Sequence, residues 1–207
     1  MIPSEQDFAA AIALWRQWNS RINVISRKDE DSIFAHHILH SLAIAQYLEI
    51  HYTVIPSEAK ESILDVGTGG GFPGIPLAMV MPEAELTLCD SIGKKVKVAQ
   101  AVVDGLGLKN VECVNARVES LKGEWDWVVS RAVTSLENFY PWVKGRFRNS
   151  ILYLKGGDIN TEIATLQKKY HIPAANIRTW RIDSWIKDDY FAEKYVIEIA
   201  NRVLIKP

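Results

Sequence analysis

Apolar positions at helical spacing mark the first part of the chain. One set predicts an amphipathic helix from about residue 5 to residue 18, and its members are Phe8, Ile12, Trp15 and Ile22, with Trp18 beside them. A second helix follows after Asp29, Asp31 or Ser32, which are suitable capping residues. Its apolar stripe is formed by Phe34, Ile38, Leu42 and Ala45. These two helices predict a helical extension that ends in a joint at residues 56–60.

From residue 61 onward the pattern changes to short apolar runs that alternate with helical segments. The runs predict strands at residues 62–66, 85–90, 111–115, 125–130 and 150–154. Such alternation is typical of a parallel sheet with helices on both faces. Residues 177–183 and 194–204 are expected to form a closing antiparallel pair. The sequence therefore predicts an α/β, Rossmann-like fold, with a helical extension at residues 1–58 packed on a domain at residues 59–207.

A glycine-rich loop follows the first predicted strand, in the sequence ILDVGTGGGFPG at residues 63–74. Glycine allows a positive φ and lets a ligand lie directly on the backbone. Unpaired N–H groups at the start of the following helix favour electron-rich groups. A unit of strand, glycine loop and helix usually binds a nucleotide-like cofactor at the carboxyl end of a parallel sheet.

The position of the glycines separates the cofactor classes. Gly69, Gly71 and Gly74 match the dinucleotide spacing, but they begin too late after the strand. The set in the correct place is Gly67, Gly69 and Gly71, and Asp65 precedes it. A carboxylate there would repel a pyrophosphate and would suit the sulfonium of S-adenosylmethionine. No Lys-Ser or Lys-Thr pair follows the glycines, so a phosphate-binding P-loop is excluded.

Asp90 closes the second predicted strand and is a candidate for cofactor binding. An acid at this place can accept hydrogen bonds from both ribose hydroxyls, in either cofactor class. A nicotinamide-dependent dehydrogenase therefore stays open at this point, although Asp65 favours the methyl donor.

Composition and charge indicate the class of protein, its location and how it could bind RNA. The chain is 48% hydrophobic and 24% charged, which is ordinary for a soluble globular protein, and no apolar run reaches the length of a bilayer span. The N-terminus lacks a signal pattern, so we expect a cytoplasmic protein without membrane association. Cys89 and Cys113 are expected to be buried and reduced. The net charge of −1 gives no general attraction to nucleic acid, so RNA would bind through local patches.

Several short motifs are distributed along the chain. They are HIL at 37–39 followed by Ser41, then DVGTGGGFPGIPLA at 65–78, CDSIGKK at 89–95, LGLKNV at 106–111, ARVE at 116–119, VSRAV at 129–133 and LKG at 154–156. With these motifs the chain resembles the RsmG (GidB) family of 16S ribosomal RNA guanine-N7 methyltransferases. His40 departs from the family pattern, which often carries Asp there. The resemblance implies a class I S-adenosylmethionine-dependent methyltransferase fold that acts on 16S ribosomal RNA or the small ribosomal subunit. A monomer is expected, although no residue pattern indicates the oligomeric state.

The resemblance also implies roles for individual residues. Gly67 and Phe72 would contact the methyl donor in the first loop, and Val118 with Glu119 would lie against the adenosine. Arg131 would complete the pocket near the methionine end, because its guanidinium fork suits a carboxylate or a phosphate.

Other positions are candidates for substrate contact. Arg131 and Lys155 could contact guanine O6 or a phosphate, since a contact to N7 would block the reactive atom. His37 and Asn23 match the family pattern and are weaker candidates. Methylation at guanine N7 needs neither a nucleophile nor a strong base, because this nitrogen carries a free lone pair.

Basic and aromatic residues complete the prediction. Phosphate contacts are expected from Lys94 and Lys95, and from Arg27 and Lys28 in the extension. The tryptophans are expected to pack in the core or between the two parts of the chain, and they are Trp15, Trp18, Trp125, Trp127 and Trp142. No metal site is expected, because the cluster of His36, His37 and His40 lacks a recognised ligand motif.

Two rival functions remain open. A small molecule or a protein could be the methyl acceptor of the same cofactor domain. Alternatively, the chain could be a non-catalytic RNA-binding module that senses the cofactor, and it would then bind both ligands without producing a methylated nucleoside.

Overall fold

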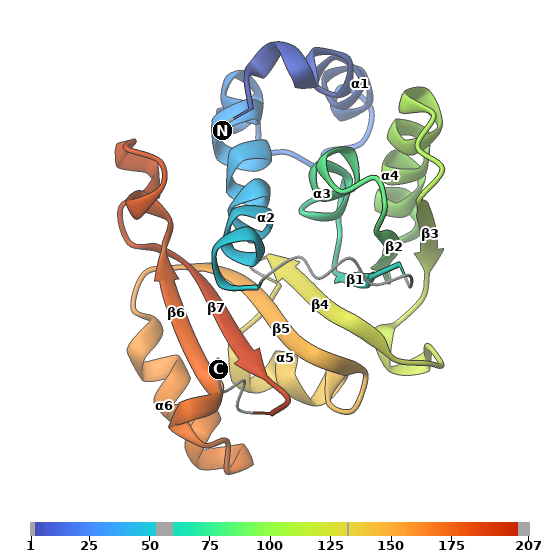
Figure 1. Cartoon of the computed structure of the whole chain (residues 1–207). Helices are drawn as coiled ribbons and strands as arrows, with labels where there is room; N and C mark the ends of the chain where they lie inside the picture. Colours follow the sequence, from blue (N-terminus) through green and yellow to red (C-terminus); the bar gives the residue numbers. More distant parts are fainter. Residues whose placement is uncertain (1–2, 53–59, 132, 203–207) are drawn as a thin grey trace.

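A mixed seven-stranded sheet forms the centre of the computed structural model, which describes residues 3–52, 60–131 and 133–202. The strands lie in the order β3-β2-β1-β4-β5-β7-β6, and the first five are parallel (Figure 1). Their bounds are β1 (Ser62–Val66), β2 (Glu85–Asp90), β3 (Val111–Asn115), β4 (Trp125–Arg131), β5 (Phe147–Gly156), β6 (Ile177–Arg181) and β7 (Lys194–Ala200).

The predicted strands are confirmed, and β5 extends beyond the expected 150–154 at both ends. The closing antiparallel pair is also confirmed, since β7 runs antiparallel to both β5 and β6. In the described part β7 ends at Ala200, and residues 203–204 of the expected strand lie outside the described residues. The fold is therefore the expected α/β sheet.

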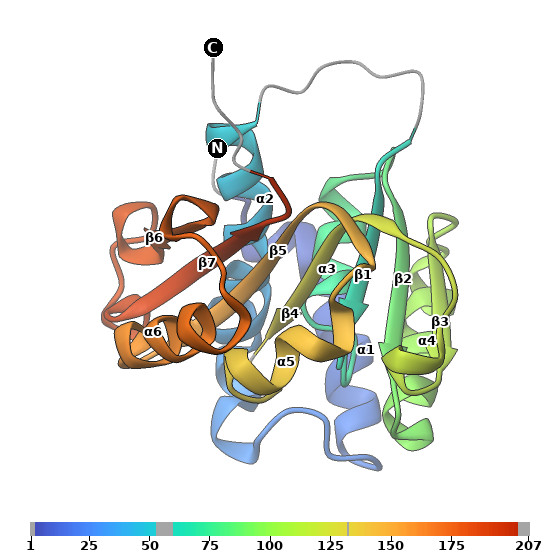
Figure 2. The ribbon, with the colours of Figure 1, turned by 90° about the horizontal axis from the view of Figure 1, so that it is seen from below.

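Helices cover the sheet on both faces, as expected. The bounds of the longer ones are α1 (Ala9–Asn19), α2 (His40–His51), α3 (Gly74–Val80), α4 (Gly93–Leu106), α5 (Leu136–Val143) and α6 (Ile159–Tyr170). Shorter helical segments are η1 (Glu5–Phe8), η2 (Arg27–Ser32), the π-helix η3 (Ile33–Leu39), η4 (Val118–Ser120), η5 (Ala174–Asn176), η6 (Ile182–Ser184) and η7 (Asp189–Phe191). Figure 2 shows α5 and α6 on one face of the sheet and α1 to α3 on the other.

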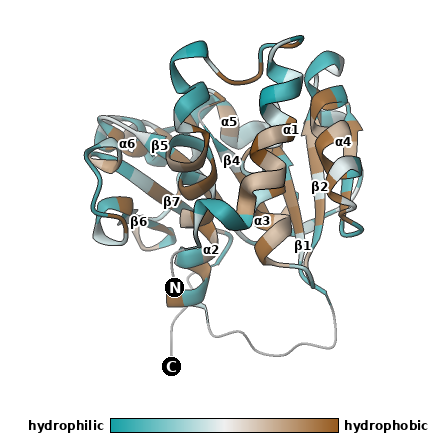
Figure 3. Ribbon diagram, turned by 90° about the horizontal axis from the view of Figure 1, so that it is seen from above, coloured by the Kyte–Doolittle hydropathy of each residue, from teal (hydrophilic) through white to brown (hydrophobic). Residues whose placement is uncertain are grey.

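Side chains that point alternately to the two faces of the sheet divide the hydrophobic core into two clusters. Ile63 on β1 and Trp127 on β4 belong to the cluster shared with α1 to α4. Their neighbours Leu64 and Val128 belong to the cluster shared with α5 and α6. Successive side chains of a strand point to opposite faces, so a sheet covered on both sides needs apolar residues at every position. Figure 3 shows hydrophobic stretches along β1, β2 and α3.

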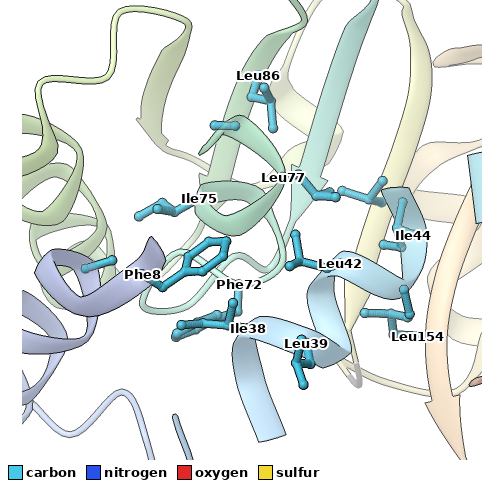
Figure 4. Close-up of a cluster of buried hydrophobic side chains, with 14 of the residues drawn as sticks. Phe8, Ile38, Leu39, Leu42, Ile44, Phe72, Ile75, Leu77, Leu86 and Leu154 are labelled. Atoms are coloured by element: carbon cyan, nitrogen blue, oxygen red, sulfur yellow. The ribbon is translucent and has the colours of Figure 1, made fainter. Parts of the chain in front are cut away.

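The N-terminal helices share one hydrophobic core with the sheet. Phe8 and Ile38 lie in the same cluster as Phe72 and Ile75 from the glycine loop and α3, together with Leu154 of β5 (Figure 4). In addition, α1 contacts α4, and α2 contacts α3, β5 and β7. The described part of the extension is thus packed on the sheet. The expected boundary between residues 58 and 59 lies outside the described residues.

A buried carboxylate fastens α2 to the sheet. Glu198 on β7 is 1% exposed, and it accepts hydrogen bonds from the hydroxyls of Tyr47, Tyr52 and Ser150. Arg178 on β6 lies 3.6 Å from the same carboxylate. Burial, followed by the hydrogen bond to Glu198, raises the pKa of Tyr47 and Tyr52, so both remain donors.

Among the described residues, no helix is long and apolar enough to cross a lipid bilayer.

Candidate functional site

A cavity of about 350 Å³ opens at the carboxyl ends of the parallel strands. Its wall contains Gly67 after β1, Asp90 at the end of β2, Val118 and Glu119 after β3, and Arg131 at the end of β4. These five sequence-predicted residues come from four separate segments, and the parallel strand arrangement brings them to one place. Open α/β sheets bind their ligands at this edge.

The backbone of the glycine loop adopts conformations that side chains disfavour. Gly67, Gly69 and Gly71 have φ angles of 72°, 58° and 106°. A Cβ atom on Gly67 would lie 2.4 Å from Cγ2 of Val133, and one on Gly71 would lie 2.3 Å from Cδ1 of Ile75. At Gly69 no heavy atom lies within 4 Å of the added Cβ. Gly67 and Gly71 are therefore required for local packing as well as for backbone shape.

Asp90 is fixed at the cavity wall by backbone donors. Its Oδ2 accepts a hydrogen bond from the N–H of Gly69 at 2.9 Å, and its Oδ1 accepts one from Ile92 at 2.8 Å. The side chain is only 7% exposed, yet it lines the cavity. Each carboxylate oxygen keeps a second lone pair, so Asp90 can still accept bonds from ligand hydroxyls.

Asp65 lies beneath the glycine loop and is not part of the cavity wall. The side chain is fully buried, and its Oδ2 accepts a hydrogen bond from the N–H of Gly74 at 2.8 Å, where α3 begins. Burial raises the pKa of Asp65 to about 7, although the Thr68 hydroxyl and the Gly74 N–H act in the opposite direction. Any influence of Asp65 on a ligand in the cavity would therefore act through its charge and the shape of the loop.

Phe72 forms the support under Arg131. Its ring stacks on Trp15 with centroids 4.3 Å apart, and only 3% of the residue is exposed. The guanidinium carbon of Arg131 lies over the same Phe72 ring, 5.1 Å from its centroid. A cation at this distance from an aromatic face is attracted to it. Phe72, Gly69 and Gly71 are not among the residues that line the cavity.

The π-helix η3 holds the end of the Arg131 side chain. Nη1 donates to the carbonyl of His36 at 3.2 Å, and Nη2 lies 2.8 Å from Nδ1 of His37. Arginine can only donate, so Nδ1 of His37 must accept and its ring proton must be on Nε2. Burial, with the charge of Arg131, lowers the pKa of His37 to about 3. His37 is therefore neutral near pH 7.

The other predicted substrate residues come from separate parts of the chain. Lys155 forms an ion pair with Oε1 of Glu162 at 2.9 Å and donates to the carbonyl of Thr134 at 3.2 Å. Lys95 lines the cavity at the start of α4, and Lys94 beside it is exposed. The remaining candidates are exposed residues of the extension, namely Asn23, Arg27 and Lys28.

Two residues of α1 hold the N-terminal loop against the glycine loop, and the sequence analysis did not identify this role. Trp15 donates from Nε1 to the carbonyl of Gly70 at 2.7 Å. Asn19 accepts the N–H groups of Val24 and Ile25 and donates to the Ile25 carbonyl. A Cβ on Gly70 would lie 2.7 Å from Val24. An asparagine at the end of a predicted helix is a signal for such a capping role.

The sequence analysis also missed part of the cavity wall. Trp142, expected to be a packing residue, lines the cavity together with Ile92 and Val133. Ile92 and Val133 are 42% and 38% exposed, which is unusual for large apolar side chains. Apolar groups at a cavity mouth suit a flat aromatic ligand.

The site contains no candidate metal centre or activated nucleophile within the described residues. No group of three or more His, Cys, Asp or Glu residues could hold a metal ion there. His36 instead pairs with Asp29 at 2.8 Å. Cys89 lines the cavity, but burial and then the nearby Asp90 raise its pKa to about 11, so it is a thiol at neutral pH. The arrangement can bind and orient ligands.

Comparison with known proteins identifies the family. The family model for rRNA small subunit methyltransferase G (GidB) matches residues 4–180. The small subunit methyltransferase G of Flavobacterium psychrophilum is 44% identical over 195 residues, covering 90% of this chain and 86% of the relative. That of Cytophaga hutchinsonii is 41% identical over 202 residues, covering 94% and 91%.

Solved structures support the fold. Magnesium protoporphyrin IX methyltransferase from Synechocystis, with bound S-adenosylmethionine, gives a TM-score of 0.65 at 15% identity, covering 96% of this chain and 95% of that one. The plantazolicin methyltransferase BpumL, in complex with S-adenosylhomocysteine, gives 0.60 at 14% identity, covering 95% and 97%. At such low identity these matches show the shared fold alone. The family match and the close relatives place the chain in the rRNA small subunit methyltransferase G family.

Proposed function

We propose that this chain transfers a methyl group from S-adenosylmethionine to N7 of a guanine in 16S ribosomal RNA. The family assigns the reaction class and the ribosomal substrate. The observation that carries the proposal is a cavity of about 350 Å³ whose wall contains Gly67, Asp90, Val118, Glu119 and Arg131 together. This size and position suit a nucleotide-like cofactor.

Each part of the cavity matches one part of the proposed cofactor. Asp90 accepts hydrogen bonds from the ribose hydroxyls, and the small Gly67 allows close approach to the backbone. Val118 and Glu119 lie against the adenosine. Arg131 provides donors for the methionine carboxylate, which a guanidinium binds through two parallel hydrogen bonds. Asp65 contributes negative charge below the loop when it is ionised.

The reaction proposed for this site is an in-line displacement. Guanine N7 attacks the methyl carbon with its lone pair, the carbon–sulfur bond breaks, and sulfur leaves as a neutral thioether. No proton is removed from N7, so the step needs no base, and Cys89 in the cavity wall is a thiol near pH 7. The contribution of the protein is to align the reacting atoms, and such positioning alone can lower the barrier strongly.

Guanine recognition remains part of the proposal. Donors from Arg131 or Lys155 would pair with O6 or a phosphate and leave N7 free to react. Lys155 would first exchange its ion pair with Glu162 for the RNA. The base has to be accessible, either in a single strand or flipped from a helix.

The proposed RNA substrate also suggests further RNA contacts and a location in the cell. Lys94, Lys95, Arg27 and Lys28 would contact RNA phosphates near the cavity, because all four lie in segments that neighbour the site. We propose a monomer as the working unit. The cytoplasm is the proposed location, because small-subunit RNA is modified there.

The test is a transfer reaction with S-adenosylmethionine that carries a deuterated methyl group. Purified protein is incubated with small ribosomal subunits from cells that lack this enzyme, and the RNA nucleosides are measured by mass spectrometry. We expect deuterium-labelled N7-methylguanosine from one position. Label in a metabolite or a protein would support the rival methyltransferase, and binding of both ligands without labelled nucleoside would support a non-catalytic sensor.

A further inference from the structure

We propose that the C-terminal segment 182–194 fixes Arg131 in the site by holding the π-helix η3, with Tyr190 as the positioning residue. The inference rests on the proposed function, because it gives Arg131 its role in binding the methyl donor. Tyr190 itself is not among the residues that line the cavity, so it would act through Arg131.

The carbonyl of His36 is the point where the two segments meet. Arg131 donates to this oxygen from Nη1 at 3.2 Å, and the Tyr190 hydroxyl donates to the same oxygen at 3.1 Å. His36 lies within η3, where the hydrogen-bond pattern of an α-helix is replaced by the wider π pattern. Such segments are frequent at functional sites. One backbone oxygen therefore joins a residue of the cavity wall to the C-terminal segment.

Ring contacts make this junction rigid. The imidazole of His36 stacks on the ring of Tyr190, with centroids 3.7 Å apart and planes 9° from parallel. Within the N-terminal extension, Nδ1 of His36 lies 2.8 Å from Oδ1 of Asp29. Nζ of Lys194 lies 3.7 Å from the Tyr190 centroid, where a cation–π attraction is expected. Tyr190 is thus fixed between η3 and the start of β7.

Arg131 depends on this junction because its described partners are neutral. Among the residues that the structure describes, it forms no ion pair with a carboxylate at salt-bridge distance. Its orientation is set by the His36 carbonyl, His37 Nδ1 and the ring of Phe72. The first two belong to η3. A shift of η3 would therefore move the guanidinium and the donors that remain for the cofactor.

Two substitutions separate the parts of the junction. Tyr190→Leu removes the hydroxyl and the ring stack, whereas Tyr190→Phe removes only the hydroxyl. We expect Tyr190→Leu to weaken S-adenosylmethionine binding about tenfold by calorimetry, because a displaced Arg131 would lose a charge-assisted hydrogen bond to the cofactor carboxylate. The Phe variant is expected to lose about threefold, since it keeps the stack. Tyr170→Phe is the matched control, because it also removes a hydroxyl bond to a backbone carbonyl, that of Glu137 at 2.8 Å, and Tyr170 is not among the residues that line the cavity.

A double-mutant cycle distinguishes positioning from general support of the fold. If Tyr190 acts through Arg131, adding Tyr190→Leu to Arg131→Lys should weaken cofactor binding no further than Arg131→Lys alone. Losses that multiply in the double variant would overturn the inference, as would wild-type affinity in both single Tyr190 variants. Should the Leu variant unfold, the same cycle with Tyr190→Phe decides the question.

Failure of this inference can be distinguished from failure of the proposed function. Cofactor binding is measured without RNA, so a protein that binds the cofactor but methylates no ribosomal RNA would refute the proposed function and leave this cycle interpretable. With active protein, the same coupling should appear in kcat/KM for the methyl donor. A change in KM for the RNA alone would instead indicate that Tyr190 contacts RNA, and it would overturn the inference.

Discussion

The replacement Asp65→Asn gives a quantitative prediction, because Asp65 is a fully buried acid beneath the cofactor loop. The asparagine oxygen can still accept the hydrogen bond from the N–H of Gly74, so the start of α3 keeps its partner. What the variant loses is the ability to ionise. The substitution therefore isolates the free-energy cost of a buried charge.

Burial raises the pKa of Asp65 from an ordinary value of 3.8 to about 7 in the folded protein. This difference corresponds to a cost of about 4 kcal/mol at most for ionising the folded state. Between these two pH values the folded chain holds a proton that the unfolded chain has released. Wild-type stability consequently falls as the pH rises from about 4 to about 7, and the asparagine variant lacks this component.

The assay is urea unfolding of wild type and Asp65→Asn at pH 5 and pH 8, without cofactor. We expect the variant to gain roughly 3 kcal/mol relative to wild type between the two pH values. Parallel stability profiles, with a constant difference between the proteins, would refute the argument. They would show that Asp65 is ionised in the folded state at both pH values.

Three further predictions concern other parts of the molecule. Arg131→Lys should weaken S-adenosylmethionine binding about tenfold by calorimetry, because lysine lacks the guanidinium fork; unchanged affinity would remove Arg131 from the site. The double replacement of Lys94 and Lys95 by Ala should lower RNA affinity and reduce the salt dependence of binding by about two phosphate contacts; an unchanged salt slope would place both lysines away from RNA. Glu198→Leu should cost about 3 kcal/mol in urea unfolding, because the Tyr47 hydroxyl and its neighbours lose a buried acceptor; a neutral effect would contradict this.

The sequence predicted the sheet well because its strands are short apolar runs with sharp boundaries. The expected 62–66, 85–90 and 111–115 match β1, β2 and β3 residue for residue. Local sequence patterns also predicted residues of the cavity wall, since Gly67, Asp90 and Arg131 each follow or end a strand. The carboxyl ends of parallel strands meet at one edge of the sheet, so the proximity of these three residues could be predicted from the sequence alone.

Contacts between distant segments could not be predicted in this way. The contact of Phe72 with the cofactor stays a prediction, whereas its stacking on Trp15 and its contact with Arg131 join segments that are far apart in the sequence. The π-helix at His36 was expected to be part of an ordinary helix, because apolar spacing does not distinguish the two. Tyr190 lies 154 residues from His36 and carries no motif.

Calorimetric titration of the purified chain with S-adenosylmethionine tests the central claim most directly, namely that the cavity beside Asp90 holds the methyl donor. We predict saturable binding at one site per chain, a rise in melting temperature, and loss of both in Asp90→Ala. Absence of binding heat and of a thermal shift in the wild-type chain, with and without ribosomal RNA, would contradict the account.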